Sequence, residues 1–370
     1  MEAYLTDLLT ALAVVLNGAP QGLLALSLGF AAFPTAVAFL IGAAGSLAFS
    51  SVATISFQAE TIAVAGKLGG NVRERLSIVF WGALFLLVPS ILGLNEKIVE
   101  IIGPVIVTSM MAGVGVMLAL VSIDMMESEK FSGGVSMVVA LAAWFVTFDL
   151  AKTIIISVAA ATVVYNILKK SGKVAAQNLI VDESREMFTF GNIEWKIWRN
   201  PKMLASALAL SCLNIGANIS FGKITGSIAN VNANIDHLAI YSSLADMGSS
   251  FLGGGPVEAI ISGTASAPHP IASSVLMMLI MAAILLLKLL PVVGRYVHSS
   301  AIAGFLFVLG VFVTFISNVQ AAIALAPAAQ GPFGFSPWGM VIGITVIASA
   351  RWNPFYGLLT GFAVKLIFGL

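Results

Sequence analysis

Two stretches of the sequence decide the fold, residues 244–267 (LADMGSSFLGGGPVEAIISGTASA) and residues 55–70 (ISFQAETIAVAGKLGG). Each places a glutamate, Glu258 or Glu60, among apolar and small residues. Placing an ionisable side chain in hydrocarbon costs about 2.5–3.5 kcal/mol or more. We therefore expect each of these acids to have a structural or functional role that offsets this cost. The apolar runs around them are too short or too rich in polar and small residues for ordinary spanning helices. We therefore expect each stretch to be a broken membrane span.

The composition places the rest of the chain in a bilayer. Of 370 residues, 59% are hydrophobic and 9% are charged, whereas soluble domains carry roughly 25% charged residues. Apolar runs bounded by turn signals give 14 candidate spans, with the third and tenth as the broken ones: 5–29, 32–50, 52–67, 76–94, 99–122, 134–148, 150–168, 203–220, 236–252, 256–267, 270–290, 296–317, 336–350 and 353–369. We expect a multi-pass integral protein of the plasma (inner) membrane. The first residues lack the basic region of a cleaved signal peptide, so we assign them to the first span.

A polar stretch, residues 169–202, divides the chain near its middle and holds seven of the eighteen basic residues. It is typical of a cytoplasmic loop with Trp195 and Trp198 at the membrane interface, although a regulatory role stays open. Residues 1–168 and 203–370 resemble each other at an offset of about 195 to 198 residues, and Gly115 in the first half corresponds to Gly310 in the second. An odd number of spans in each half predicts two inverted seven-span repeats, as in secondary transporters.

The two buried glutamates are candidates for the transport site. Glu60 precedes a helical run, and Glu258 follows Gly253-Gly254-Gly255-Pro256, which is a helix-start signal. Two helix N-termini at the midplane would offer backbone N–H groups to a ligand, around Ala59, Thr61 and Ala259. The glutamates would take a substrate N–H group or the coupling proton. The alternative is that each acid only caps its own helix.

Buried polar residues near these breaks extend the candidate site. Asn214 and Asn218 lie four residues apart on one face of the eighth span, and Asn17 and Gln21 repeat this spacing in the first. Their amides could bind a substrate or hold helices together. Asp246 precedes the glycine run and is either a second coupling acid or a helix cap.

Other polar residues favour structural interpretations. Asp149 and Lys152 are expected to pair with each other at an interface or hinge, and His269, between two prolines, to be a loop histidine. The three histidines and one cysteine, Cys212, have no metal-ligand spacing, and there is no nucleotide-binding loop or legible nucleophile–base pair. An enzyme, a bound metal and a cofactor other than a coupling proton or sodium ion are therefore disfavoured. The net charge of +1 argues against a nucleic-acid partner.

The sequence resembles the xanthine/uracil permease family of nucleobase:cation symporters. The resemblance rests on residues 244–267, on a fifth span opening IIGPVIVTSMMAGVGV and on a twelfth opening SSAIAGFLFVLGV. It implies a core domain of spans 1–4 and 8–11, a gate domain of spans 5–7 and 12–14, and often a homodimer. The family's tenth-span Glu or Gln falls at Ser262 here, and its eighth-span acid matches Asn214 or its neighbour. Substrate contacts therefore do not transfer residue by residue.

Charge distribution and resemblance predict opposite orientations. Fourteen of the eighteen basic residues flank the C-terminal ends of odd-numbered spans. The positive-inside rule places that side in the cytoplasm and both termini outside, whereas the family resemblance implies both termini inside.

We conclude from the sequence that this is a secondary transporter of a small polar solute, a nucleobase as the leading substrate, coupled to protons or sodium. An anion transporter of the same fold, for sulfate or a carboxylate, is the first alternative. Buried carboxylates and the lack of an arginine in any span argue against it. A passive channel or non-transporting membrane protein is the second alternative.

Overall fold

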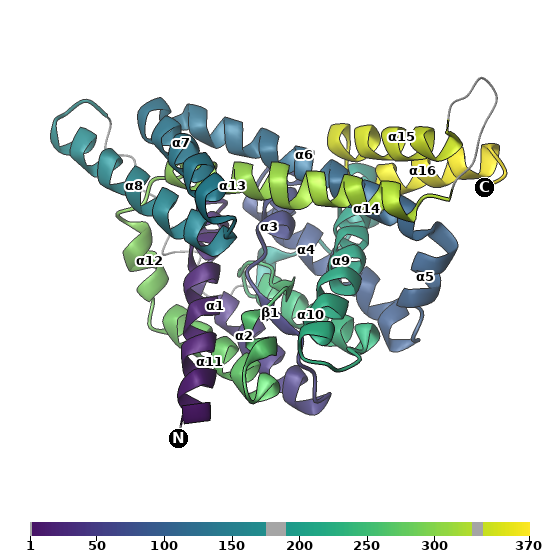
Figure 1. Cartoon of the computed structure of the whole chain (residues 1–370), viewed down its shortest axis with the longest axis horizontal. Helices are drawn as coiled ribbons and strands as arrows, with labels where there is room; N and C mark the ends of the chain where they lie inside the picture. The colour runs from purple at the N-terminus through teal and green to yellow at the C-terminus, as the bar shows by residue number, and fades with distance from the viewer. Residues whose placement is uncertain (1, 175–189, 328–335) are drawn as a thin grey trace.

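The computed structural model describes residues 2–174, 190–327 and 336–370 (Figure 1). The first half contains α1 (Glu2–Ser27), α2 (Ala32–Ala48), β1 (Thr54–Ser56), α3 (Ala59–Leu68), α4 (Val72–Ile91), α5 (Asn95–Ile102), α6 (Pro104–Ser128), α7 (Lys130–Thr147) and α8 (Leu150–Lys170). The second half contains η2 (Phe190–Asn192), η3 (Ile197–Arg199), α9 (Pro201–Ile228), α10 (Ile235–Phe251), β2 (Glu258–Ile260), η4 (Gly263–Ser266), α11 (Pro270–Leu286), α12 (Leu289–Gly294), α13 (Ser300–Val308), the π-helix η5 (Leu309–Ile316), α14 (Ser317–Leu325), α15 (Pro337–Arg351) and α16 (Pro354–Ile367).

The predicted fold class is confirmed: the protein is a multi-pass, all-α membrane protein whose third and tenth spans are broken by short strands. Seven of the described helices, α6 and α9 among them, are long and apolar enough to cross a membrane. The order α1, α2, β1, α3 in the first half returns as α9, α10, β2, η4 in the second. This order, together with the antiparallel pairing of the two strands, is that of an inverted repeat.

The helices lie in two layers, one above the other in Figure 1. In the lower layer, α4 packs against α9 and α10, and α2 packs against α10 and α11. In the upper layer, α13 packs against α6 and α7, and α15 packs against α6 and α16. Helix α3 connects the layers, since it contacts α1 and α9 below and α6 above.

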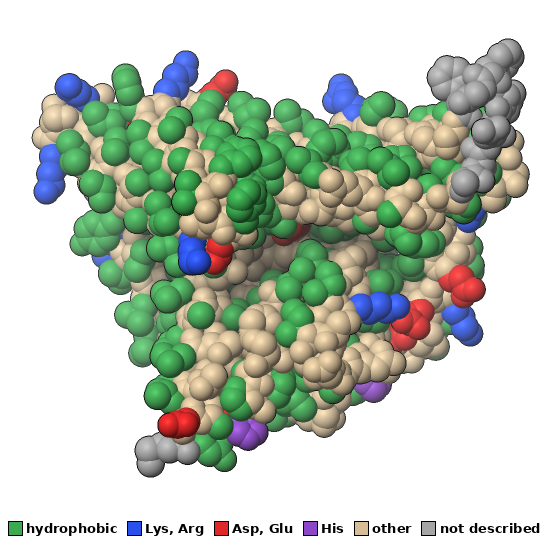
Figure 2. All heavy atoms as spheres, in the orientation of Figure 1, with side chains coloured by type: hydrophobic (Ala, Val, Ile, Leu, Met, Phe, Trp, Pro, Cys, Tyr) green, Lys and Arg blue, Asp and Glu red, His purple; other side chains and the backbone are tan. Residues whose placement is uncertain are grey.

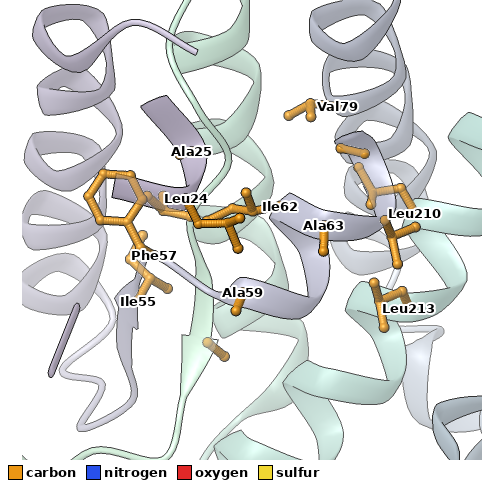
Figure 3. Close-up of a cluster of buried hydrophobic side chains, with 14 of the residues drawn as sticks. Leu24, Ala25, Ile55, Phe57, Ala59, Ile62, Ala63, Val79, Leu210 and Leu213 are labelled. Atoms are coloured by element: carbon orange, nitrogen blue, oxygen red, sulfur yellow. The ribbon is translucent and has the colours of Figure 1, made fainter. Parts of the chain in front are cut away.

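Apolar side chains surround α3 on the side of the lower layer. Figure 3 shows Ile62 and Ala63 of α3 between Leu24 of α1 and Leu210 of α9, and all four are buried. In a bilayer, helices associate through close packing of small and apolar residues rather than by hydrophobic exclusion from water. This packing fixes the direction in which α3 leaves the strand before it.

Two glycines that the sequence matched as repeat partners meet in the upper layer. Gly310 in η5 lies against Gly115 in α6, where a Cβ atom on Gly115 would lie 2.6 Å from the Gly310 carbonyl oxygen. Neither position can therefore accept a side chain without displacing the backbone of the other helix. The contact holds the π-helix close to α6.

Candidate transport site

The two broken spans meet in a two-stranded antiparallel sheet. Ser56 of β1 lies opposite Glu258 of β2, and Thr54 lies opposite Ile260. Backbone polar groups within a membrane need internal partners, and non-helical backbone is tolerated only where protein surrounds it. The sheet supplies those partners at the point where both spans stop being helical.

After β1 the chain enters α3, and the predicted helix start next to Glu60 is confirmed. The residue before the helix, Gln58, is extended at φ −123° and ψ 117° and does not cap the helix with its own side chain. Instead, Oε1 of Gln21 in α1 accepts a hydrogen bond of 2.8 Å from the backbone N–H of Ala59. The N–H group at Ala59 that we expected to face a ligand is therefore already bonded to Gln21.

After β2 the chain does not enter an α-helix, and the predicted helix start at Pro256 and Glu258 is wrong. Glu258 is the first residue of β2, and only the single 3₁₀ turn η4 lies between this strand and α11, which begins at Pro270. The backbone before the strand is held extended by other elements, because Oδ1 of Asp246 accepts a 2.7 Å hydrogen bond from the N–H of Val257. The second break therefore has no α-helix N-terminus.

A cavity of about 120 Å³ lies at the start of α3, between the two layers. The first helix and the first break supply its polar lining, which is Asn17, Gln21, Ser56, Gln58 and Glu60. Leu150, Leu309 and Val313 close it from the upper layer. Figure 2 shows the hollow between the layers, with acidic atoms in red at its back.

Within this cavity Glu60 is hydrogen-bonded across the layers. Its side chain is buried, and Oε1 accepts a 3.2 Å hydrogen bond from the hydroxyl of Thr314 in η5. Gln58 accepts a 2.6 Å hydrogen bond at Oε1 from Thr61. By contrast, Gln58 Nε2 and the Ser56 hydroxyl are buried without a hydrogen-bond partner among the described residues. Asn17 Oδ1, an acceptor, is likewise buried without a partner among the described residues, so two donors and one acceptor of the cavity lining remain available to a ligand.

Glu258 belongs to a second polar cluster that joins α9, α10 and β2. Asn214 Nδ2 donates a hydrogen bond to Glu258 Oε1, and the carboxyl group of Asp246 lies beside that of Glu258. Thr61 connects this cluster to the first break through a 3.2 Å hydrogen bond to Asn214 Oδ1. Asn218 donates to Ser242 at 3.4 Å. These residues are fully buried and are not part of the cavity lining.

The structure thus divides the predicted site residues into two groups. Asn17, Gln21 and Glu60 line the cavity, whereas Thr61, Asn214, Asn218, Asp246 and Glu258 form the buried cluster or lie next to it. Ala259 is paired with Ile55 in the sheet. Ser262 caps η4, accepting a hydrogen bond of 3.2 Å from the N–H of Thr264.

Three residues of the cavity region were not predicted: Ser56, Gln58 and Thr314. Ser56 and Gln58 flank Phe57 in the β-prone stretch, and their alternation was the available signal. Thr314 is a single hydroxyl in the apolar run VLGVFVTFIS. Only its position opposite Glu60 in the folded chain gives it a role.

The predicted ion pair between Asp149 and Lys152, at the rim of the cavity, is confirmed. Lys152 Nζ lies 3.2 Å from Asp149 Oδ2, next to Leu150 in the lining. A hydrogen bond from the backbone N–H of Lys152 lowers the pKa of the Asp149 carboxyl, and the Lys152 side chain adds to this. Asp149 therefore stays charged and caps α8.

His269, expected to be a loop histidine, is the residue that precedes α11. Its Nδ1 lies 2.8 Å from Oδ2 of Asp7, so it links α1 to α11.

In the described ranges, no group of three or more His, Cys, Asp and Glu side chains could hold a metal ion.

Solved structures with the same fold are membrane transporters. No family model matches the sequence, and no curated protein matches it by sequence. The transmembrane domain of the cyanobacterial bicarbonate transporter BicA matches with a TM-score of 0.65 and 14% identity, over 98% of this chain and 97% of that one. Murine Slc26a9, a solute carrier 26 anion transporter in its inward-facing state, matches with a TM-score of 0.71 and 14% identity, over 99% of this chain and 68% of that one. A further SLC26A9 structure matches with a TM-score of 0.65 and 12% identity, over 99% and 65%.

These matches correct the resemblance inferred from the sequence. The assignment to the xanthine/uracil permease family is wrong, because the matching structures are a bicarbonate transporter and solute carrier 26 anion transporters. The error has a physical cause, since both groups share the fold with two inverted seven-span repeats. At 14% identity, the likeness concerns the fold alone: this chain has the fold of the membrane domain of these transporters.

Proposed function

We propose that the protein is a secondary transporter that carries a small anion across the membrane by alternating access. BicA is a bicarbonate transporter and Slc26a9 an anion transporter, and each matches nearly the whole of this chain. Of the two substrate classes that the sequence left open, this likeness supports the anion.

Two buried groups in the cavity carry the proposal. The Ser56 hydroxyl and the Gln58 side-chain NH₂ line the cavity and have no hydrogen-bond partner within the described part of the chain. A buried donor without a partner costs about 1–3 kcal/mol. The oxygens of bicarbonate, sulfate or a carboxylate are acceptors that would satisfy both donors. The N-terminus of α3 adjoins them, and its partial positive charge favours an anion.

Glu60 sets the charge state in which an anion can bind. Its carboxyl group lines the cavity, and none of the described Lys or Arg side chains does. Two negative charges a few ångströms apart in a low-dielectric site repel each other strongly. The anion therefore binds when Glu60 carries a proton, which also makes Glu60 a hydrogen-bond donor. This removes the objection that the buried carboxylates raised, because anion and proton cross the membrane together.

Asp246 and Glu258 form a second candidate site for the coupling ion. Two adjacent buried carboxyl groups cannot both be ionised without a cation, so they share a proton. Asn214 orients Glu258 by donating to it. A sodium ion bound by the same carboxylate oxygens is the alternative, and sodium-free buffer separates the two, because only sodium-coupled uptake would stop.

Transport would proceed by movement of the two layers against each other. The core comprises spans 1–4 and 8–11, and the gate comprises spans 5–7 and 12–14. Glu60 contacts Thr314 of the gate, so its protonation and the binding of the anion both act at the boundary between them. We expect the protein to be a homodimer, and chemical crosslinking in the membrane would test this.

Uptake by the purified protein in liposomes tests the proposed function. We expect accumulation of labelled sulfate, which has no membrane-permeant neutral form, that depends on an inwardly directed proton gradient. Uracil and xanthine serve as controls from the other substrate class that the sequence left open. Uptake of these bases without uptake of any anion would contradict the proposal, and anion flux that equilibrates without responding to the gradient would indicate a passive channel.

A further inference from the structure

A second cavity, away from the transport site, lies where helices α4 and α9 begin. Its volume is about 380 Å³, and three cationic side chains, Arg73, Lys196 and Arg199, line it together with Asn71 and Asn200. Two acids, Glu74 and Glu194, also contribute to the lining, which leaves an excess of positive charge. Asn71 and Asn200 are the N-caps of α4 and α9, so the positive ends of two helices adjoin the cavity.

The segment that carries Lys196 and Arg199 is firmly attached to the helices beneath it. Ile193 and Ile197 are buried, four residues apart. Trp81 Nε1 donates a 3.0 Å hydrogen bond to the carbonyl oxygen of Glu194, and the N–H of Glu194 donates to the Ser77 hydroxyl at 2.8 Å. The cavity is therefore built by fixed backbone and not by a freely moving loop.

Exposed tryptophans place the cavity at the membrane interface. Trp195 and Trp198, which flank Lys196, are 49% and 64% exposed. Tryptophans with one face in the protein and one exposed favour the headgroup level of a bilayer. Trp195 packs edge-to-face against Phe80 of α4, which fixes this level relative to the cavity.

The arrangement of charges at the cavity favours a phosphate group. Arg73 pairs with Glu194 at 3.2 Å, which holds one guanidinium at the edge of the cavity. Lys196 and Arg199 add two further positive charges. The cavity lies on the side that carries fourteen of the eighteen basic residues, and the positive-inside rule predicts that this side faces the cytoplasm. The cytoplasmic leaflet is the one rich in anionic lipids.

We propose that this cavity binds the phosphate headgroup of an anionic phospholipid from the cytoplasmic leaflet. The acyl chains would lie against the lipid-facing surface beside Trp198, while Lys196, Arg199 and the two helix N-termini hold the phosphate. Binding would fix the segment at residues 190–200 to the membrane surface.

Lipid titration of the full-length protein by native mass spectrometry tests this site. The probes are phosphatidylglycerol, the neutral-headgroup lipid phosphatidylcholine, and inorganic phosphate as a competitor. We expect Lys196→Gln combined with Arg199→Gln to weaken phosphatidylglycerol binding by about tenfold or more, because each cation near the surface contributes to the attraction. Both substitutions leave the pair between Arg73 and Glu194 in place.

A matched double variant, Lys170→Gln with Lys202→Gln, removes the same charge on the same side outside the cavity lining. It should bind phosphatidylglycerol as the wild type does. Equal binding by both double variants would overturn the proposal, and so would displacement of the lipid by millimolar inorganic phosphate, which would indicate a site for a free anion. If the first double variant does not fold, Arg199→Gln alone is compared with Lys202→Gln.

Discussion

The two broken spans contain the same elements but face different surroundings. In the third span, the strand leads into an α-helix, and Glu60 lines a cavity and is hydrogen-bonded to the opposite layer. In the tenth span, the strand leads into a single 3₁₀ turn, and Glu258 is enclosed by Asn214 and Asp246. One break places its acid at a cavity, whereas the other encloses its acid among buried polar side chains, where Glu258 Oε2 and Asp246 Oδ2 have no hydrogen-bond partner among the described residues.

Because of this difference, we expect Glu60 and Glu258 to have different roles in transport, although they look equivalent in the sequence. In the proposed mechanism, Glu60, which lines the cavity and is hydrogen-bonded to Thr314 of the opposite layer, exchanges its proton as the layers move. Glu258 does not line the cavity, so we expect it to hold a proton or a cation without contacting the substrate. We therefore expect substitutions at the first break to alter anion transport directly, and substitutions at the second break to act on stability and coupling.

The largest effect is expected for Glu60→Gln. A gradient of one pH unit corresponds to about 1.4 kcal/mol and can drive about tenfold accumulation of an anion that moves with one proton. The glutamine variant carries no exchangeable proton, so it should equilibrate the anion without accumulating it. Uptake into liposomes with and without the gradient measures this. Unchanged accumulation would show that Glu60 is only a helix residue.

Glu258→Leu should mainly destabilise the protein. It leaves the Asn214 amide without the acceptor that it has in the wild type, at a cost of about 1–3 kcal/mol for each unpaired buried group. Thermal unfolding in detergent should show a lower Tm for Glu258→Leu than for Glu258→Gln, which keeps an acceptor. The comparison between the two breaks fails if Glu60→Leu lowers the Tm equally.

A smaller effect on affinity is expected for Gln58→Leu. Loss of one donor to a charged ligand costs about 1.5 kcal/mol or more, which corresponds to about a tenfold rise in KM for the anion. Ser262→Ala removes a side chain that contacts η4 in the other break and is the matched control. If the two variants have equal KM values, the cavity is not where the anion binds.

The smallest effect is expected for substitution of His298. It should change how stability depends on pH without changing how transport depends on pH. His298, in the connection before α13, is largely buried, and this burial lowers its pKa from 6.5 although Glu129 opposes the shift. The unfolded chain therefore binds a proton there more readily than the folded chain. The contribution of His298 to the free energy of unfolding is fully present above pH 6.5 and is lost as the pH drops below that value.

Removing the ring should flatten that decline. We expect His298→Asn to reduce the loss of Tm between pH 6.5 and more acidic buffers, while proton-driven uptake keeps its dependence on Glu60. A change in the proton coupling of the His298 variant would instead place part of the coupling outside the two breaks.

The sequence predicts the membrane class, the spans and the two breaks, because scarce charge and turn residues are local signals. It does not predict the backbone conformation around the second break. Gly253-Gly254-Gly255-Pro256 resembles a helix start, but the hydroxyl of Thr35 accepts a 2.8 Å hydrogen bond from the Gly255 N–H and holds the backbone extended. That partner is 220 residues away in the chain, so no local pattern could show it.

The candidate site was predicted in part for the same reason. Glu60 and Glu258 are visible as acids in apolar surroundings, and Asn17, Gln21 and Asn214 as amides at helical spacing. Whether each faces a cavity or a buried partner depends on contacts between the halves. Gln58 was missed because its importance lies in a side-chain NH₂ that is left unpaired by the folded structure.

Substrate protection of introduced cysteines tests the central claim most directly. In a Cys212→Ala background, which removes the one native cysteine, Ser56→Cys and Ser262→Cys are labelled with a small thiol reagent in the presence of bicarbonate or sulfate. We predict that the transported anion slows labelling at residue 56 and leaves labelling at residue 262 unchanged. Protection at residue 262 without protection at residue 56 would contradict an anion site at the first break.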